Sequence, residues 1–166
     1  MRLHIQLLAL LVAAVLLAGC SFHLRGQATM PFQTLYLKAT NPGTPFIKEL
    51  SRNLEANNVK LVDIAAKADV VLDIVSEIPD KQILSLSGNG RVNEYQLFYR
   101  VSLRAYDHGQ HDVIPAEEIV MQNDFPYDDS NVIAMESQET LLYQNLRSDI
   151  VQRIVNRLSR VKLKPH

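Results

Sequence analysis

The chain has 166 residues, of which 47% are hydrophobic, and it carries 17 Lys and Arg residues against 18 Asp and Glu residues. This length suits one domain, and the hydrophobic share is enough to build a buried core. The near balance of charge argues against a general nucleic-acid-binding protein, which needs a basic face, so we predict no nucleic-acid partner.

The first 20 residues have the pattern of a bacterial lipoprotein signal. Arg2 and His4 precede an apolar run, residues 5–17, that is too short to span a bilayer, for which about 20 residues are needed. The run ends in Leu17-Ala18-Gly19-Cys20, and Cys20 is the only cysteine of the chain. Small residues followed by a cysteine are typical of the site at which such signals are cut and acylated. A plain secretory signal with an incidental cysteine is the alternative.

We therefore predict that residues 1–19 are removed and that Cys20 carries an S-diacylglycerol and an N-acyl chain, with no other cofactor. Two or more chains are what stable membrane anchoring requires. Ser21, rather than Asp, follows the cysteine, which in lipoproteins of this type favours export to the outer membrane. The mature protein is then anchored to the outer membrane and faces the periplasm.

Behind the anchor we expect a lipidated tether, residues 20–31, then a single domain over residues 32–162, and a short tail, residues 163–166. Because acylation uses the only thiol, no disulfide stabilises this domain, although the periplasm would permit one.

A strand and a helix are predicted at the start of the domain. Residues 33–39 alternate apolar and polar side chains, as a half-buried strand does. Thr44 is placed to cap a helix that has Pro45 at its first position and ends near residues 57–58. The apolar face of this helix consists of Phe46 or Ile47, Leu50 and Leu54.

Two long strands form a predicted hairpin in the middle of the chain. The first runs over residues 69–76, or on toward residue 86, with Pro79 marking a bend or an edge. Asn89-Gly90 supplies the positive φ angles of a tight hairpin. In the second strand, residues 95–105, one face holds Tyr95, Leu97, Tyr99, Val101, Leu103 and Ala105, and the other holds Gln96, Phe98, Arg100, Ser102 and Arg104.

A last strand and a long helix complete the prediction. After a turn at residues 107–110, alternate side chains from Glu117 to Phe125 indicate the strand. Asp128-Asp129-Ser130 gives candidates for the N-cap of a helix running to Val161. The apolar residues of that helix recur at every fourth position: Leu142, Leu146, Ile150, Ile154 and Leu158.

The resulting order, β-α-β-β-β-α, predicts an α+β fold. A β-α-β start gives a right-handed crossover between parallel strands, and the two hairpins add antiparallel neighbours. We expect both helices to pack on one face of a four-stranded mixed sheet.

Three segments carry a resemblance to a known family. An aromatic-His-Leu-Arg run follows the acylated cysteine in Cys20-Ser21-Phe22-His23-Leu24-Arg25-Gly26. Asn93-Glu94-Tyr95-Gln96-Leu97 begins the long central strand, and residues 134–158 fit the last helix. Over essentially the whole mature length, the chain resembles the LPS-assembly lipoproteins (LptE, or rare lipoprotein B).

The resemblance implies a lipoprotein that sits in the lumen of a large outer-membrane β-barrel, the LPS-assembly protein LptD, which it plugs and helps to assemble. It also implies that the protein binds lipopolysaccharide and helps to deliver it to the outer leaflet. Basic positions near the central hairpin are implicated in lipopolysaccharide contact in such proteins. This chain departs from that pattern at two positions. Gly88, not a basic residue, precedes Asn89-Gly90, with Arg91 after the turn instead, and Met135 stands where some relatives are basic.

Four basic residues are the candidate ligands for lipopolysaccharide. The phosphates of lipid A call for several Arg or Lys side chains, since guanidinium forks bind phosphates in bidentate fashion. Arg91, Arg100 and Arg104 lie on or beside one predicted strand, and Lys81 is expected across the hairpin. Arg100 and Arg104 share a face with Phe98, which makes a basic and aromatic stripe. The alternative is a solvated sheet face on which such residues only maintain solubility.

The sequence offers no catalytic or metal-binding motif. His108 and His111 lie in a turn flanked by Asp107 and Asp112, but no third ligand follows at a suitable spacing, so we predict no metal site. No spacing pairs a nucleophile with a base, so we predict that the protein is not an enzyme. A lipid-anchored periplasmic cell-envelope enzyme of unknown substrate is the alternative function.

Overall fold

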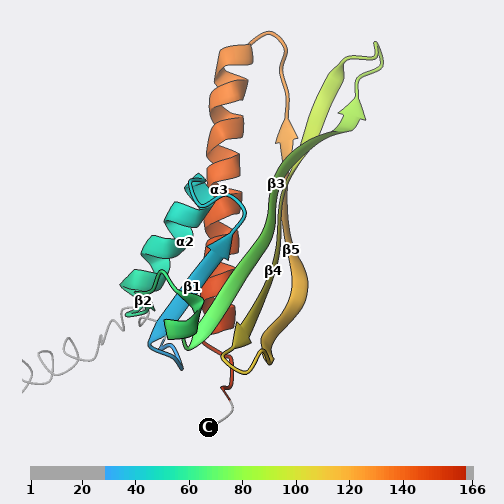
Figure 1. Cartoon of the computed structure of the whole chain (residues 1–166). Helices are drawn as coiled ribbons and strands as arrows, with labels where there is room; N and C mark the ends of the chain where they lie inside the picture. The colour runs from blue at the N-terminus through green and yellow to red at the C-terminus, as the bar shows by residue number, and fades with distance from the viewer. Residues whose placement is uncertain (1–28, 164–166) are drawn as a thin grey trace, which may run out of the picture.

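The structure is a computed structural model that describes residues 29–163 (Figure 1). The predicted signal, Cys20, most of the tether and residues 164–166 lie outside the described residues. The elements in chain order are β1 (Thr34–Ala39), α2 (Pro45–Ala56), β2 (Lys60–Leu61), the 3-10 helix η1 (Ala65–Lys67), β3 (Val70–Leu86), β4 (Val92–Asp107), β5 (Asp112–Pro126) and α3 (Val132–Leu158).

The strands form one mixed sheet in the order β2-β1-β3-β4-β5. β1 runs parallel to β2 and β3, whereas β4 runs antiparallel to both β3 and β5. Because α2 and α3 both lie against one face of the sheet (Figure 1), the predicted α+β fold is confirmed. The sheet has five strands rather than the predicted four, since the two-residue β2 is too short to show an alternation.

The β3–β4 hairpin extends beyond the rest of the sheet (Figure 1). β1 ends at Ala39, so the later part of β3 has only β4 as a neighbour, and Pro79 lies in that part, opposite Tyr99. This position agrees with the predicted edge. In the turn, Gly90 alone has a positive φ, 78°, and Asn89 does not share it as predicted. The reason is a three-residue loop, closed by the N–H of Ser87 bonding to the carbonyl of Arg91, which needs one left-handed residue.

The core fills the space between the sheet and the two helices. The predicted inner face of β4 is confirmed by the burial of Leu97, Tyr99, Val101, Leu103 and Ala105. The helices contribute Phe46, Ile47, Leu50 and Leu54 from α2, and Leu146, Ile150, Ile154 and Leu158 from α3. Within residues 29–163, no helix covers the opposite face of the sheet (Figure 1), which we call the outer face.

The start of α3 differs from the prediction. Its N-cap is Asn131, whose side chain makes no capping hydrogen bond, and the helix ends at Leu158, earlier than expected. The predicted cap at Asp128-Asp129-Ser130 is wrong, because Asp128 instead accepts hydrogen bonds from the N–H and the hydroxyl of Ser130. Aspartate readily closes such a local turn, and this competes with capping.

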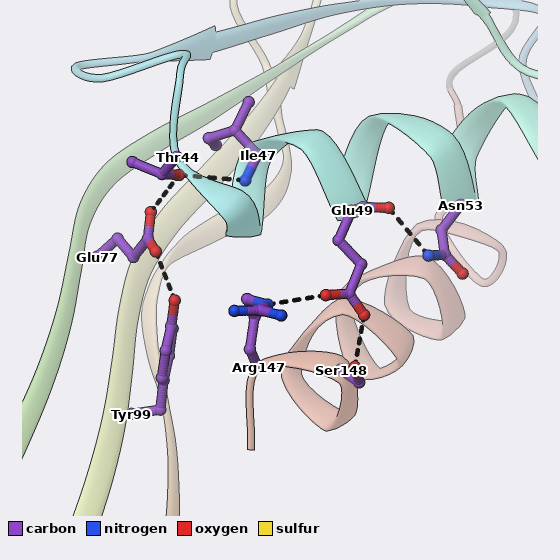
Figure 2. A network of polar contacts seen from close by, with 8 residues as sticks. All are labelled: Thr44, Ile47, Glu49, Asn53, Glu77, Tyr99, Arg147 and Ser148. Carbon is purple, nitrogen blue, oxygen red and sulfur yellow. Dashed lines mark hydrogen bonds and ion pairs between the residues drawn. The ribbon is translucent and has the colours of Figure 1, made fainter. Parts of the chain in front are cut away.

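Thr44 caps α2 as predicted and also ties this helix to the sheet (Figure 2). Its Oγ1 accepts a 3.2 Å hydrogen bond from the N–H of Ile47. The same hydroxyl donates a 2.7 Å bond to Oε2 of Glu77 on β3, and the hydroxyl of Tyr99 on β4 donates to Oε1 of that carboxylate. Burial, together with the bond to Glu77, raises the pKa of Tyr99, so its hydroxyl remains a donor. Through the carboxylate of Glu77, this capping residue therefore links α2 to both β3 and β4.

A second set of contacts joins α2 to α3 (Figure 2). Glu49 on α2 accepts a 2.8 Å hydrogen bond from Nε of Arg147 and another from the hydroxyl of Ser148. Burial raises the pKa of Glu49, but the bonds from Ser148 and Arg147 outweigh this effect and hold that pKa below its usual value. Glu49 is therefore ionised at neutral pH and pairs with Arg147 at the helix interface.

The packing of α3 predicts different costs at two adjacent positions. Ile154 is fully buried, so Ile154→Ala should lower the free energy of unfolding by about 2–5 kcal/mol. Arg153 is exposed, and Arg153→Ala should change that free energy little. Denaturant unfolding of both variants measures the difference, and equal losses would contradict the assigned helix face.

Candidate functional site

The outer face carries the basic and aromatic stripe that was predicted for β4. The guanidinium carbon of Arg100 lies 4.6 Å from the centroid of the Phe98 ring, and that of Arg104 lies 4.8 Å from the centroid of the Tyr106 ring. Both are cation–π contacts, in which the electron-rich face of the ring attracts the cation. Each ring therefore holds one guanidinium group against the sheet.

Two of the four predicted cations do not join this stripe. A β-bulge after Ile74 shifts the register of β3 by one residue, so Lys81 pairs with Leu97 and shares its inner face. There the Nζ atom of Lys81 lies 2.8 Å from Oε2 of Glu139 on α3. Arg91 lies at the hairpin tip, and its Nη1 is 3.1 Å from Oδ2 of Asp129.

Arg100 forms an ion pair that an incoming anion can displace. Its Nη1 lies 3.2 Å from Oδ2 of Asp80, with 29% and 35% of the two side chains exposed. Hydrogen bonds from Gln82 and from Arg100 hold the pKa of Asp80 below its usual value, so this carboxylate is ionised at neutral pH. A pair with this much solvent contact contributes little to stability. The pair therefore leaves the outer face without a strongly held carboxylate at Arg100.

Arg104 lies in one row across the sheet with a cation that sequence reasoning missed. Asp73 on β3 pairs in register with both Lys38 on β1 and Arg104 on β4. Lys38 binds this carboxylate at 2.8 Å, and the hydrogen bond raises the pKa of Lys38. No ion pair involves Arg104 within residues 29–163, so the row across three strands keeps an excess positive charge. The alternation along the first strand predicts that Lys38 lies on the face opposite to Leu37. Its position near Arg104 follows only from the strand order, in which β3 lies between β1 and β4.

A hollow of about 470 Å³ lies where β1 ends, between the start of α2 and the later part of β3. Glu77 is the one titratable side chain among its lining residues. Both oxygens of Glu77 are engaged by the hydroxyls of Thr44 and Tyr99. The hydroxyl of Thr44 also accepts the capping bond from the N–H of Ile47, so the contacts of this carboxylate belong to the helix cap and the sheet. We assign it the structural role described above.

One histidine of the β4–β5 turn, His111, also has a local partner. The Nδ1 atom of His111 lies 3.2 Å from Oδ1 of Asp107, and the N–H of His111 donates to the same oxygen. Within residues 29–163, no group of three or more His, Cys, Asp or Glu side chains is placed to hold a metal ion. No helix in this part of the chain is long and apolar enough to cross a membrane.

Comparison with known proteins identifies the family. The family model for LptE, described as lipopolysaccharide-assembly, matches residues 32–158. The chain belongs to the LptE family. This result confirms the resemblance that was drawn from the run after Cys20, the start of the central strand and the last helix.

LptE proteins of other bacteria match most of the sequence. The chain is 31% identical over 161 residues to the LPS-assembly lipoprotein LptE of Yersinia pestis strain Pestoides F, which covers 95% of this chain and 77% of that protein. The LptE of Yersinia pseudotuberculosis serotype O:1b is similar to the same extent.

Solved structures of related lipoproteins have the same fold. The solution NMR structure of an uncharacterized lipoprotein B from Nitrosomonas europaea is 34% identical, with a TM-score of 0.73, over 84% of this chain and 90% of that one. The crystal structure of the rare lipoprotein B from Shewanella oneidensis is 25% identical, with a TM-score of 0.69, over 76% of this chain and 94% of that one.

Proposed function

We propose that this LptE chain is an outer-membrane lipoprotein that works in lipopolysaccharide assembly. In this role it plugs the lipopolysaccharide-translocating β-barrel LptD, assists the assembly of that barrel, and binds lipopolysaccharide for delivery to the outer leaflet. The family match over residues 32–158 is the observation that carries the proposal. The lipoprotein signal that ends at Cys20 and the basic stripe of the outer face support it from the chain's own residues.

The protruding hairpin supports the role as a plug. Ile83 and Leu86 are each 58% exposed, and Leu84 is 45% exposed, near its tip. Apolar side chains gathered on a projecting segment are typical of a surface that contacts another protein. We assign this tip to the contact with the barrel partner.

The outer face supports the binding of lipopolysaccharide. Arg100 and Arg104 are held by aromatic rings with their N–H groups at the surface, and Lys38 adds a third cation beside Arg104. Lipid A phosphates would accept hydrogen bonds from these groups and displace Asp80 from Arg100. Lys81 and Arg91 remain candidate contacts that would have to exchange Glu139 and Asp129 for phosphate.

The first test concerns the anchor at Cys20. Cys20→Ala should abolish acylation and cleavage of the signal, because the thiol is the acceptor of the diacylglycerol. Metabolic labelling with a fatty-acid probe should show incorporation in the wild-type chain and none in the variant. Continued labelling of the variant would contradict the assignment of Cys20.

The second test separates the plug from the alternative of a free-standing cell-envelope enzyme. The plug should co-purify from detergent extracts in a stoichiometric complex with a much larger outer-membrane barrel. Crosslinkers placed at Leu84 should capture that barrel, because Leu84 is exposed near the hairpin tip. A protein recovered alone from mild detergent, with no crosslinked product, would favour the alternative.

The third test measures lipopolysaccharide binding. The double variant Arg100→Gln, Arg104→Gln should lose about 100-fold in affinity, since each charge-assisted hydrogen bond contributes about 1.5 kcal/mol or more. Binding by the wild-type chain should also weaken as salt rises. The matched control is Lys48→Gln, Arg52→Gln, which removes two exposed cations from α2. Unchanged affinity in a double variant that melts like wild type would move the ligand away from the outer face.

A further inference from the structure

The charges of α3 are divided between its two halves. Residues 132–146 carry Glu136 and Glu139 and no Lys or Arg. Residues 147–163, which include the end of the helix and the segment after it, carry five basic side chains against Asp149 alone. These five are Arg147, Arg153, Arg157, Arg160 and Lys162.

Three of these arginines line one hollow. Arg153 and Arg157 are four residues apart on α3, so they share one side of the helix axis, and Arg160 follows just after the helix ends. Together with Met121 of β5 and one acidic residue, Asp149, they border an open hollow of about 520 Å³. We call these residues and the neighbouring Lys162 the basic hollow.

The basic hollow holds more positive charge than its neighbours neutralise. The Nη2 atom of Arg157 lies 3.1 Å from Oε2 of Glu117 on β5. Arg153, Arg160 and Lys162 are exposed, and none of them forms an ion pair with another residue of 29–163. Guanidinium groups without a carboxylate partner around an open hollow are suited to bind phosphate oxygens.

The helix dipole explains only part of this clustering of basic residues. Cations near a helix C-terminus are stabilising, but the effect is confined to the last turn. Arg157 lies in the last turn of α3, whereas Arg153 lies before it and Lys162 lies beyond the end of the helix at Leu158. The helix dipole therefore does not explain the presence of Arg153 and Lys162.

The basic hollow lies toward the anchored end of the molecule. The described chain begins at the end of the sheet where α3 finishes (Figure 1), and Met30 and Phe32 pack on the same core as Val161 and Leu163. Cys20 precedes Thr29 by nine residues, which span at most about 30 Å when extended. Acyl chains on Cys20 would thus hold this end of the domain near the lipid head groups.

We infer that the basic hollow docks on anionic phospholipid head groups of the leaflet that holds the anchor. The inference rests on the proposed acylation of Cys20 and adds a second, electrostatic contact beside it. Exposed basic residues near an anionic leaflet are attracted to its phosphates, and each such residue strengthens the contact about fivefold. Together the two contacts would set the orientation of the domain on the membrane.

The experiment uses the purified, acylated full chain in vesicles. Because acylation occupies Cys20, a cysteine introduced by Asn156→Cys, within the basic hollow, is the only free thiol and can carry a fluorophore. Gln138→Cys, exposed on the other half of α3, provides the control label. Quenching by a nitroxide on the lipid head group is compared in phosphatidylcholine vesicles and in equimolar phosphatidylcholine and phosphatidylglycerol.

We expect strong quenching at position 156 in the anionic vesicles only, and little quenching at position 138 in either. The triple variant Arg153→Gln, Arg160→Gln, Lys162→Gln should return position 156 to its level in neutral vesicles, a loss of about 100-fold in the contact equilibrium. High salt should have the same effect. The control is Lys48→Gln, Arg52→Gln, which removes two exposed cations from α2 and should leave the quenching unchanged.

Two results would overturn the inference. One is equal quenching at position 156 in neutral and anionic vesicles. The other is a triple variant that keeps its phosphatidylglycerol-dependent quenching but loses binding to purified lipopolysaccharide, which would assign the basic hollow to the transported lipid.

Flotation with neutral vesicles tests separately whether Cys20 is acylated. A chain that does not float with them but still binds anionic vesicles through the basic hollow would refute the acylation and support the docking surface.

Discussion

The surface chemistry of this protein depends on one constraint: both helices pack on the same face of the sheet. Because α2 and α3 share that face, the core is closed on one side only. Alternate residues of β4 are then free to place Arg100 and Arg104 against aromatic rings on the other side. A second helical layer would have required apolar side chains at those positions, since buried charges need partners.

The polar contacts of α2 lie near the point at which β3 loses β1 as its neighbouring strand. Glu77 follows the point at which β1 leaves β3, so it lies at the root of the projecting hairpin. Thr44, the N-cap of α2, and Tyr99 of β4 bind its two carboxylate oxygens. Further along α2, Glu49 binds Arg147 of α3. The root is thereby connected to both helices, while the tip extends without such support. The fold thus combines a firmly held base with an exposed projection.

Sequence reasoning succeeded where a pattern is long. The alternation along β4 and the four-residue repeat of α3 each span many residues, so their inner faces were predicted correctly. Features that are short, or in which a local hydrogen bond competes with a helix cap, were not predicted. β2 has only two residues, and Asp128 closes a turn instead of capping α3. Lys81 was expected across the hairpin, but a bulge in β3 puts it on the inner face, away from Arg100, and no residue type marks such a bulge in one sequence.

The later part of β3 leaves one row of backbone hydrogen-bonding groups without a neighbouring strand within residues 29–163. Thr40 and Tyr143 reach only the carbonyls of Val75 and Asp80 along it. A long open edge with apolar side chains is a template on which strands of other chains can form. The later part of β3 is therefore the place where a strand of another protein would find backbone groups to pair with.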